Sequence, residues 1–90
     1  MIYLIFEVVH ADGSAATGKI FASCWINKND EGVARRQAVR LIEENDYKEV
    51  NCLESYAICR EDYVESKEGL EYFEQALIDE EVLVLFVSEV

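Results

Sequence analysis

The sequence predicts an α+β fold, a two-layer sandwich in which a four-stranded mixed sheet carries both helices on one face. The main observation is the order of its segments, ββαβαβ: four runs rich in β-branched and aromatic residues are interspersed with two runs of helical periodicity. The 90 residues are 51% hydrophobic and contain no proline, which is enough apolar material for one core. We therefore expect residues 1–90 to form a single domain.

Residues 2–9 and 19–26 are the first two predicted strands. Apolar side chains occupy both faces of the first strand, with Glu7 as the one interruption, which is typical of a strand in the middle of a sheet. The loop 10–18 contains the turn-forming pair Asp12 and Gly13, and it favours a hairpin between the two strands.

The first predicted helix follows the capping residues Asn27, Asn29 and Asp30 and runs to about Asn45. Its apolar stripe comprises Val33, Ala34, Ala38, Leu41 and Ile42. A third strand is expected over 50–59, with a bulge or bend near Glu54.

The second predicted helix spans 66–78, with Ser66 as its N-cap. Leu70, Phe73 and Leu77 recur along it at helical spacing. The last predicted strand, 82–87, is apolar on both faces and far too short to cross a membrane as a helix.

Both helices link strands, and right-handed connections would place them on the same face of the sheet. The opposite face would then display apolar side chains of the first and last strands, whether the odd-numbered or the even-numbered residues point outward. Contiguous apolar surface of this kind marks association sites. We therefore expect a homodimer formed through the open sheet face, unless the sheet curls or the loop 10–18 covers it.

The formal net charge of −11 is concentrated in the second half of the chain. Residues 1–53 hold 8 acidic and 6 basic residues, whereas residues 54–90 hold 11 acidic and 2 basic ones. This charge disfavours direct nucleic-acid binding and steers basic proteins toward the molecule. We recognise no signal sequence and no membrane-length apolar run, and we expect a cytoplasmic protein with no membrane partner.

The three cysteines, Cys24, Cys52 and Cys59, are odd in number and lack C-x-x-C spacing. This pattern favours reduced, packed thiols over disulfides, and it lacks the ligand spacing of a zinc site. Cys59 is the strongest candidate for a reactive thiol because Arg60 follows it, but the acidic residues after Arg60 raise the pKa of a thiol. No metal or cofactor is expected.

His10 and Asp12 form one candidate binding position. His10 is the single histidine, and Asp12 follows two residues later. No nucleophile elbow surrounds the neighbouring serines, so no catalytic residue is assigned.

Aromatic and acidic residues supply the other candidates for binding. Trp25 and Tyr63 combine an aromatic ring with a polar tip, which suits both the edge of a core and a recognition surface. The outer surface of the second helix carries Glu65, Glu68, Glu71 and Glu74. This acidic face is either a contact for a basic protein or, more simply, a solvated helix face.

Four stretches carry a resemblance: 25–27 (WIN), 34–47 (ARRQAVRLIEENDY), 60–63 (REDY) and 72–77 (YFEQAL). Together they resemble small uncharacterised bacterial proteins of about this length. The resemblance implies a bacterial origin and carries no activity, ligand or catalytic residue with it. The ββαβαβ order also resembles ferredoxin-like α+β sandwiches but departs from their βαββαβ order.

These observations favour a non-catalytic protein-binding or regulatory module that self-associates and meets a basic partner through residues 66–78 or the loop 10–18. An inhibitor of a basic, nucleic-acid-processing protein is one form of this hypothesis. The alternative is a small enzyme or ligand-binding subunit with a site at the dimer seam, to which His10, Cys59 or Tyr63 contributes. A purely structural accessory subunit is the third interpretation.

Overall fold

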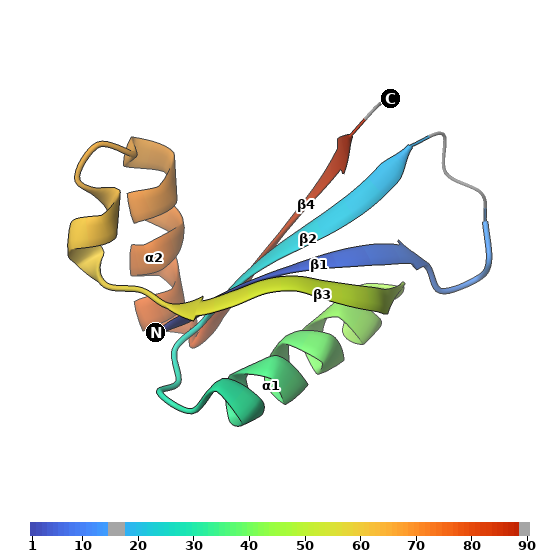
Figure 1. Cartoon of the computed structure of the whole chain (residues 1–90), viewed down its shortest axis with the longest axis horizontal. Coiled ribbons are helices and arrows are strands. Elements are labelled where there is room, and N and C mark those ends of the chain that lie inside the picture. Colours follow the sequence, from blue (N-terminus) through green and yellow to red (C-terminus); the bar gives the residue numbers. More distant parts are fainter. Residues whose placement is uncertain (15–17, 89–90) are drawn as a thin grey trace.

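The computed structural model describes residues 1–14 and 18–88, so positions 15–17 of the loop 10–18 lie outside the described residues. The elements are, in order, β1 (Ile2–His10), β2 (Lys19–Ile26), α1 (Glu31–Glu44), β3 (Tyr47–Ala57), the 3-10 helix η1 (Arg60–Tyr63), α2 (Lys67–Asp79) and β4 (Glu81–Ser88) (Figure 1). The α+β class is confirmed, and η1 occupies part of a segment that we expected to be a simple connector. None of the described helices is long and apolar enough to cross a membrane.

The four strands form one sheet in the order β3-β1-β2-β4. Every neighbouring pair is antiparallel, so the prediction of a mixed sheet is wrong. The prediction treated both helix connections as right-handed crossovers, which join parallel strands, and it left the strand order open. In the structure β1 lies between β2 and β3, and β4 pairs with β2 at the opposite edge. The expectation that the first strand is central is confirmed.

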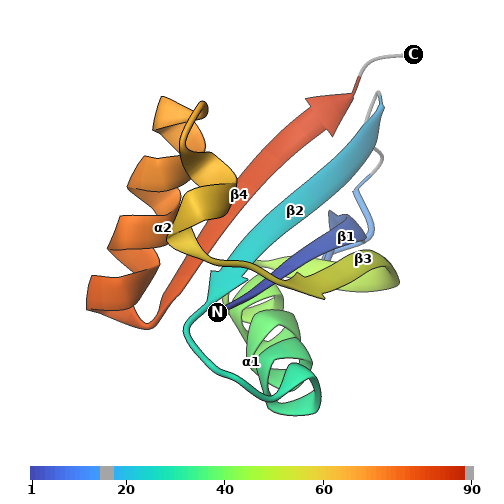
Figure 2. The ribbon, with the colours of Figure 1, turned by 60° about the vertical axis from the view of Figure 1, so that its left-hand side comes forward.

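The two helices pack on opposite faces of the sheet, which contradicts the expectation that they share one face. Successive side chains of a strand point to opposite faces. Leu4 and Cys24 belong to the core cluster that includes α1, whereas Tyr3 and Trp25 belong to the cluster that includes α2. Figures 1 and 2 show the helices well apart, with α1 beneath the sheet and α2 beside the end at which β4 begins.

The course of the chain explains why the handedness argument failed for α2. Ile2 pairs with both Ile26 and Ala57, and Ile26 pairs with Glu81, so β3 ends and β4 begins at the same end of the sheet. Helix α2 therefore spans that end between two antiparallel edge strands. The right-handed rule concerns parallel strands, and it places no constraint on this connection.

Helix α1 packs mainly against β3, and also against β1 and β2, through small and branched residues. Ala34, Ala38 and Ile42 are fully buried, and the short alanine side chains let the helix lie close to the sheet. The carboxylate of Asp30 caps the helix by accepting a hydrogen bond from the Val33 amide at 2.9 Å. Val33 itself is 39% exposed, so it does not belong to the buried stripe as predicted.

Strand β3 begins three residues earlier than predicted and is irregular. Ile5 pairs with Glu54 while Phe6 pairs with Cys52, so one register shift lies beside the predicted bend. A second shift separates the partners of Glu7 and Val8. Such irregularities bend and twist an edge strand.

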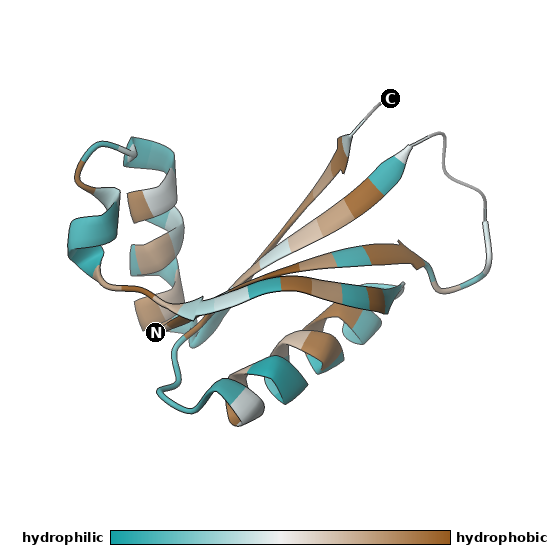
Figure 3. Ribbon diagram, viewed as in Figure 1, coloured by the Kyte–Doolittle hydropathy of each residue, from teal (hydrophilic) through white to brown (hydrophobic). Residues whose placement is uncertain are grey.

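Helix α2 covers only part of its face of the sheet. The uncovered part displays a group of apolar side chains that we call the sheet patch: Ile5, Phe21, Leu53 and Phe86. The rings of Phe21 and Phe86 stack with centroids 5.4 Å apart, and Phe86 is 45% exposed. The adjoining β4 is hydrophobic along most of its length (Figure 3). An apolar surface therefore remains open beside α2.

Candidate functional site: an aromatic pocket beside helix α2

A pocket of about 290 Å³ lies where α2 meets the sheet. We call it the aromatic pocket, and its lining comprises Tyr3, Trp25, Tyr56, Tyr63, Ser66, Glu68, Gly69 and Tyr72. It contains the single tryptophan of the chain and four of its five tyrosines. Five aromatic side chains therefore surround one hollow.

The pairing of three strands brings the first three rings together. Tyr3 of β1 lies directly opposite Trp25 of β2 and Tyr56 of β3. The ring centroid of Tyr3 is 4.9 Å from that of Trp25 and 5.5 Å from that of Tyr56. Both pairs are tilted, which is a favourable geometry for aromatic rings.

Trp25 is the most buried of the five aromatic side chains, at 6% exposure. Its indole Nε1 donates a hydrogen bond to the hydroxyl of Tyr63 at 2.9 Å. Its ring also lies 4.9 Å from the ring of Tyr72 on α2. One buried indole thus fixes the positions of two further rings that come from η1 and α2.

Ser66 and Gly69 allow α2 to approach this cluster. The Ser66 hydroxyl caps the helix by accepting a hydrogen bond from the Gly69 amide at 3.2 Å. A Cβ atom on residue 69 would lie 2.5 Å from Cδ1 of Tyr63. Glycine is therefore needed here because the helix backbone and the tyrosine ring are in close contact.

Glu68 supplies the carboxylate of the pocket. Its Oε1 accepts a hydrogen bond from the Tyr72 hydroxyl at 2.9 Å, which raises the pKa of Tyr72. Burial raises the pKa of Tyr63 and Tyr56, and the nearby charge of Asp62 raises both further. These tyrosines are therefore neutral at physiological pH, and negative charge surrounds them.

Neutral aromatic rings beside a carboxylate are suited to a positively charged ligand. The face of an aromatic ring is electron-rich, and it attracts an ammonium or guanidinium group within about 6 Å. Glu68 adds a formal negative charge at the same place. The aromatic pocket therefore has the chemistry of a cation-binding site.

Three of the predicted site residues, Trp25, Tyr63 and Glu68, come together in this pocket. Glu65 and Glu71 are exposed outside its lining, and Glu74 forms an ion pair with Arg60. Tyr3, Tyr56 and Tyr72 line the pocket but were not predicted as site residues. Their aromatic type was visible, but the strand order that makes Tyr3 a neighbour of Trp25 was not.

His10 and Asp12 lie at the other end of the sheet. His10 ends β1, whereas the aromatic pocket lies where β1 begins. The His10 ring lies tilted against the ring of Tyr47, with centroids 5.1 Å apart. Asp12 accepts a hydrogen bond from the Ser14 amide at 2.9 Å, and its contacts with Ser14 lower its pKa. These two residues therefore take part in a turn that is remote from the pocket.

The cysteines have the properties of unreactive thiols. Burial raises the pKa of Cys24 to about 12. Cys59 is exposed, but a hydrogen bond with Glu61 raises the pKa of its thiol. Within residues 1–14 and 18–88, no group of three or more potential ligands is placed to hold a metal ion.

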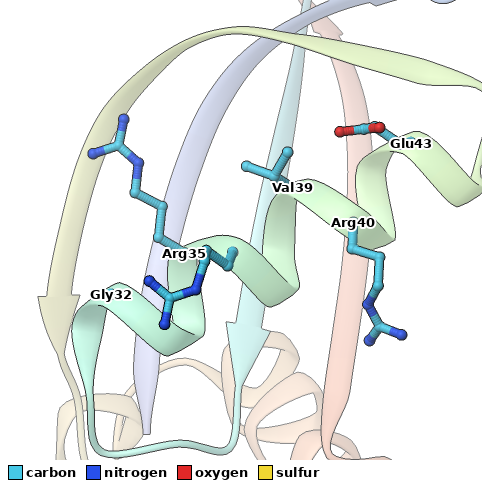
Figure 4. Close-up of a pocket in the computed structure, with 6 residues that line it drawn as sticks. Gly32, Arg35, Val39, Arg40 and Glu43 are labelled. Carbon is cyan, nitrogen blue, oxygen red and sulfur yellow. The ribbon is translucent and has the colours of Figure 1, made fainter.

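A second hollow, of about 430 Å³, lies on the outer face of α1 (Figure 4). All of its lining residues, among them Arg35, Val39 and Arg40, belong to that one helix. Arg35 pairs with Glu49 at 3.9 Å, and Arg40 pairs with Glu81 at 3.1 Å. A ligand there would contact a single helix, and two of the three arginines in the lining already have carboxylate partners, so the aromatic pocket is the better candidate.

Comparison of the chain with protein-family models, with curated proteins and with solved structures finds no match.

Proposed function

We propose that the protein is a non-catalytic protein-binding module whose aromatic pocket receives a positively charged side chain of a basic partner. The observation that carries this proposal is the convergence of five aromatic rings and Glu68 on one hollow. Contact of a cation with aromatic faces contributes about 0.5–2 kcal/mol to the binding free energy, and the contribution is larger where the cation is shielded from water.

The charge of the whole molecule supports the same kind of partner. The net charge is −11, and the pocket lies among residues of the more acidic half. A field of this sign raises the rate at which basic proteins meet the surface. The pocket then binds one side chain of the partner at a defined position, which a uniformly acidic surface does not provide.

The alternative proposal, a small enzyme or ligand-binding subunit, has less support. It expects His10, Cys59 or Tyr63 to contribute to a site at the dimer seam. His10 and Tyr63 lie at opposite ends of the sheet, and the pKa of Cys59 is shifted away from that of a nucleophile. A dimer seam that brought His10 of one copy to Tyr63 of another would restore this alternative.

Trp25 provides a direct test, because it is the single tryptophan and contacts the pocket. We expect a hexa-lysine peptide to change the tryptophan fluorescence of the full chain in a saturable way. Glu68→Gln is expected to weaken binding several-fold more than Glu71→Gln, which removes the same charge from an exposed position outside the lining. Equal losses would assign the binding to general surface charge, and an unchanged fluorescence would overturn the proposal.

We further propose that the module forms a homodimer through the sheet patch and the adjoining edge of β4. Phe86 is 45% exposed, and among the described strands β4 pairs with β2 alone, so its outer edge is available. Exposed apolar edge strands are templates for pairing with another chain. Glu54 lines this patch and Glu7 lies opposite Phe21 on the same face, while the other lining residues are apolar.

Sedimentation analysis of single-residue variants tests this dimer. Phe86→Lys is expected to shift the chain to monomer, because a charge would be buried in the contact. Ile78→Lys is the matched control, since Ile78 is 75% exposed on α2 and outside the sheet patch. A wild-type chain that is monomeric at about 100 μM, or variants that dissociate equally, would contradict the dimer.

We also propose that the protein works in the cytoplasm. Its three cysteines are free thiols. Free thiols persist in reducing compartments.

A further inference from the structure

We infer that the aromatic pocket selects a methylated ammonium group, carried by a methylated lysine in a basic protein segment, over an unmodified lysine or arginine. This inference rests on the proposed function, because it names which cationic side chain the pocket prefers. It follows from the state of the polar groups in the lining and from the size of the pocket.

Among the described hydrogen bonds, every polar side chain of the lining except that of Tyr56 already takes part in one. The Tyr63 hydroxyl accepts from Trp25 Nε1, and the Tyr3 hydroxyl donates to Ser23 at 3.1 Å. Glu68 Oε1 accepts from Tyr72. The Ser66 hydroxyl accepts from the Gly69 amide. The one carboxylate among the lining residues is therefore partly occupied before any ligand arrives.

This arrangement penalises a cation that brings several hydrogen-bond donors. An unmodified ammonium has three N–H donors and a guanidinium has five. Each donor that loses water without gaining an acceptor costs about 1–3 kcal/mol. A trimethylammonium group has no N–H donor, and its methyl groups can pack against the rings. Aromatic rings are accordingly well suited to quaternary ammonium groups.

The dimensions of the pocket fit such a group. Its volume of about 290 Å³ compares with about 30 Å³ for one water molecule, so a trimethylammonium group and part of its methylene stem can enter. Adjacent rings have centroids 4.9–5.5 Å apart. The Trp25–Tyr63 hydrogen bond and the close contact at Gly69 hold the rings in place, so little ordering is left for the ligand to impose.

The charges around the pocket favour a protein segment over a small molecule as the source of this group. Burial raises the pKa of Tyr56 most, and the carboxylates of Glu54 and Asp62 are close enough to raise it further. Basic residues on either side of a methylated lysine would meet these carboxylates. Free choline makes no such contacts, and neither does the headgroup of a phosphatidylcholine vesicle.

The experiment compares matched probes against the full chain by calorimetry. One short peptide, with arginines flanking a central position, is made with lysine, trimethyl-lysine or an uncharged tert-butyl isostere at that position. We expect the trimethyl-lysine peptide to bind roughly 5–30-fold more tightly than either of the others, as a contact of this type implies. Free choline and phosphatidylcholine vesicles are expected to bind at least tenfold more weakly than the trimethyl-lysine peptide, by the loss of the flanking contacts.

Variants connect the preference to the rings. Tyr56→Leu is expected to abolish the preference for trimethyl-lysine, and Tyr56→Phe to retain it, because the second variant keeps the ring. Tyr56 is 48% exposed, so neither change should unfold the protein. Tyr47→Leu, at the far end of the sheet, serves as the control for loss of a ring elsewhere.

The outcomes separate this inference from the proposed function. Equal binding of lysine and trimethyl-lysine peptides overturns the inference and leaves the proposed function in place. Binding of free choline or vesicles as tight as that of the peptide overturns the assignment to a protein segment. Failure of all cationic peptides to bind overturns both proposals.

Discussion

At the residue scale, the hydrogen bond between Trp25 and Tyr63 joins the stability of the fold to the shape of the pocket. Tyr63→Phe keeps the ring but leaves the buried indole Nε1 without its acceptor. Because an unsatisfied buried donor costs about 1–3 kcal/mol, we expect the free energy of unfolding in urea to fall by about that amount. Tyr47→Phe removes a hydroxyl from the other end of the sheet, and we expect it to change stability by less than about 0.5 kcal/mol. If Tyr63→Phe left the free energy of unfolding unchanged, water would have to replace the lost acceptor.

Gly69 is the second residue on which the pocket depends. A Cβ atom in Gly69→Ala would meet the Tyr63 ring at 2.5 Å, and that ring must move. We expect a loss of about 1–3 kcal/mol in stability, as is typical of overpacking, together with an altered Trp25 emission spectrum. Gly32→Ala changes a glycine near the start of α1, where the nearest atom is 3.3 Å from the new Cβ. It should leave the Trp25 spectrum unchanged, and identical spectra for both variants would contradict the close contact.

Cys59 offers a prediction about pH. The hydrogen bond with Glu61 raises the pKa of its thiol, so less thiolate is present at pH 8 than in an unperturbed cysteine. We expect iodoacetamide to alkylate Cys59 more slowly than a cysteine in a short peptide, and Glu61→Gln to increase the rate. Cys24, whose pKa is raised to about 12 by burial, should remain unmodified until the protein is unfolded. If Glu61→Gln left the alkylation rate of Cys59 unchanged, the result would argue against the hydrogen bond between Cys59 and Glu61.

Residue types were easier to predict than residue neighbours. Trp25, Tyr63 and Glu68 were predicted as site residues from their chemistry, and the aromatic pocket contains all three. Tyr3 was not predicted, because the partner of a strand residue depends on strand order and register. These are set by contacts between distant parts of the chain, which local periodicity does not encode.

At the scale of single elements, helix capping connects α2 to the pocket. Ser66→Ala removes the acceptor for the Gly69 amide, and Asp30→Ala removes the acceptor for the Val33 amide at the start of α1. We expect each change to cost about 0.5–2 kcal/mol in thermal or urea unfolding. Only Ser66→Ala should weaken the binding of a cationic peptide, because its helix end lines the pocket. Equal effects on binding would show that global stability, and not the position of α2, controls the site.

The elements themselves were predicted well wherever local signals determine them. The strand 19–26 was placed correctly, and the caps Asp30 and Ser66 lie at or beside the predicted starts of their helices. The face on which α2 packs was wrong, because it depends on β4 pairing with β2 and running antiparallel to β3. Leu77 was also placed in the buried stripe of α2, but it is 42% exposed, since the helix is rotated so that Gly69, Phe73 and Ala76 face the sheet.

At the scale of the whole molecule, the position of α2 divides one face of the sheet into two surfaces. The covered end forms the aromatic pocket with its acidic surroundings, and the open end leaves the sheet patch. One surface is expected to bind through charge and the other through apolar contact. The two proposed interactions therefore depend on ionic strength in opposite ways.

Salt provides the last prediction. A net charge of −11 opposes the approach of two copies and assists the approach of a basic peptide. The screening length falls from about 10 Å at 0.1 M salt to about 3 Å at 1 M, so added salt weakens both effects. We expect sedimentation to show a stronger homodimer at high salt, while calorimetry shows weaker binding of the peptide. If salt weakened both interactions together, the dimer contact would be electrostatic in origin, and the sheet patch could not be its main component.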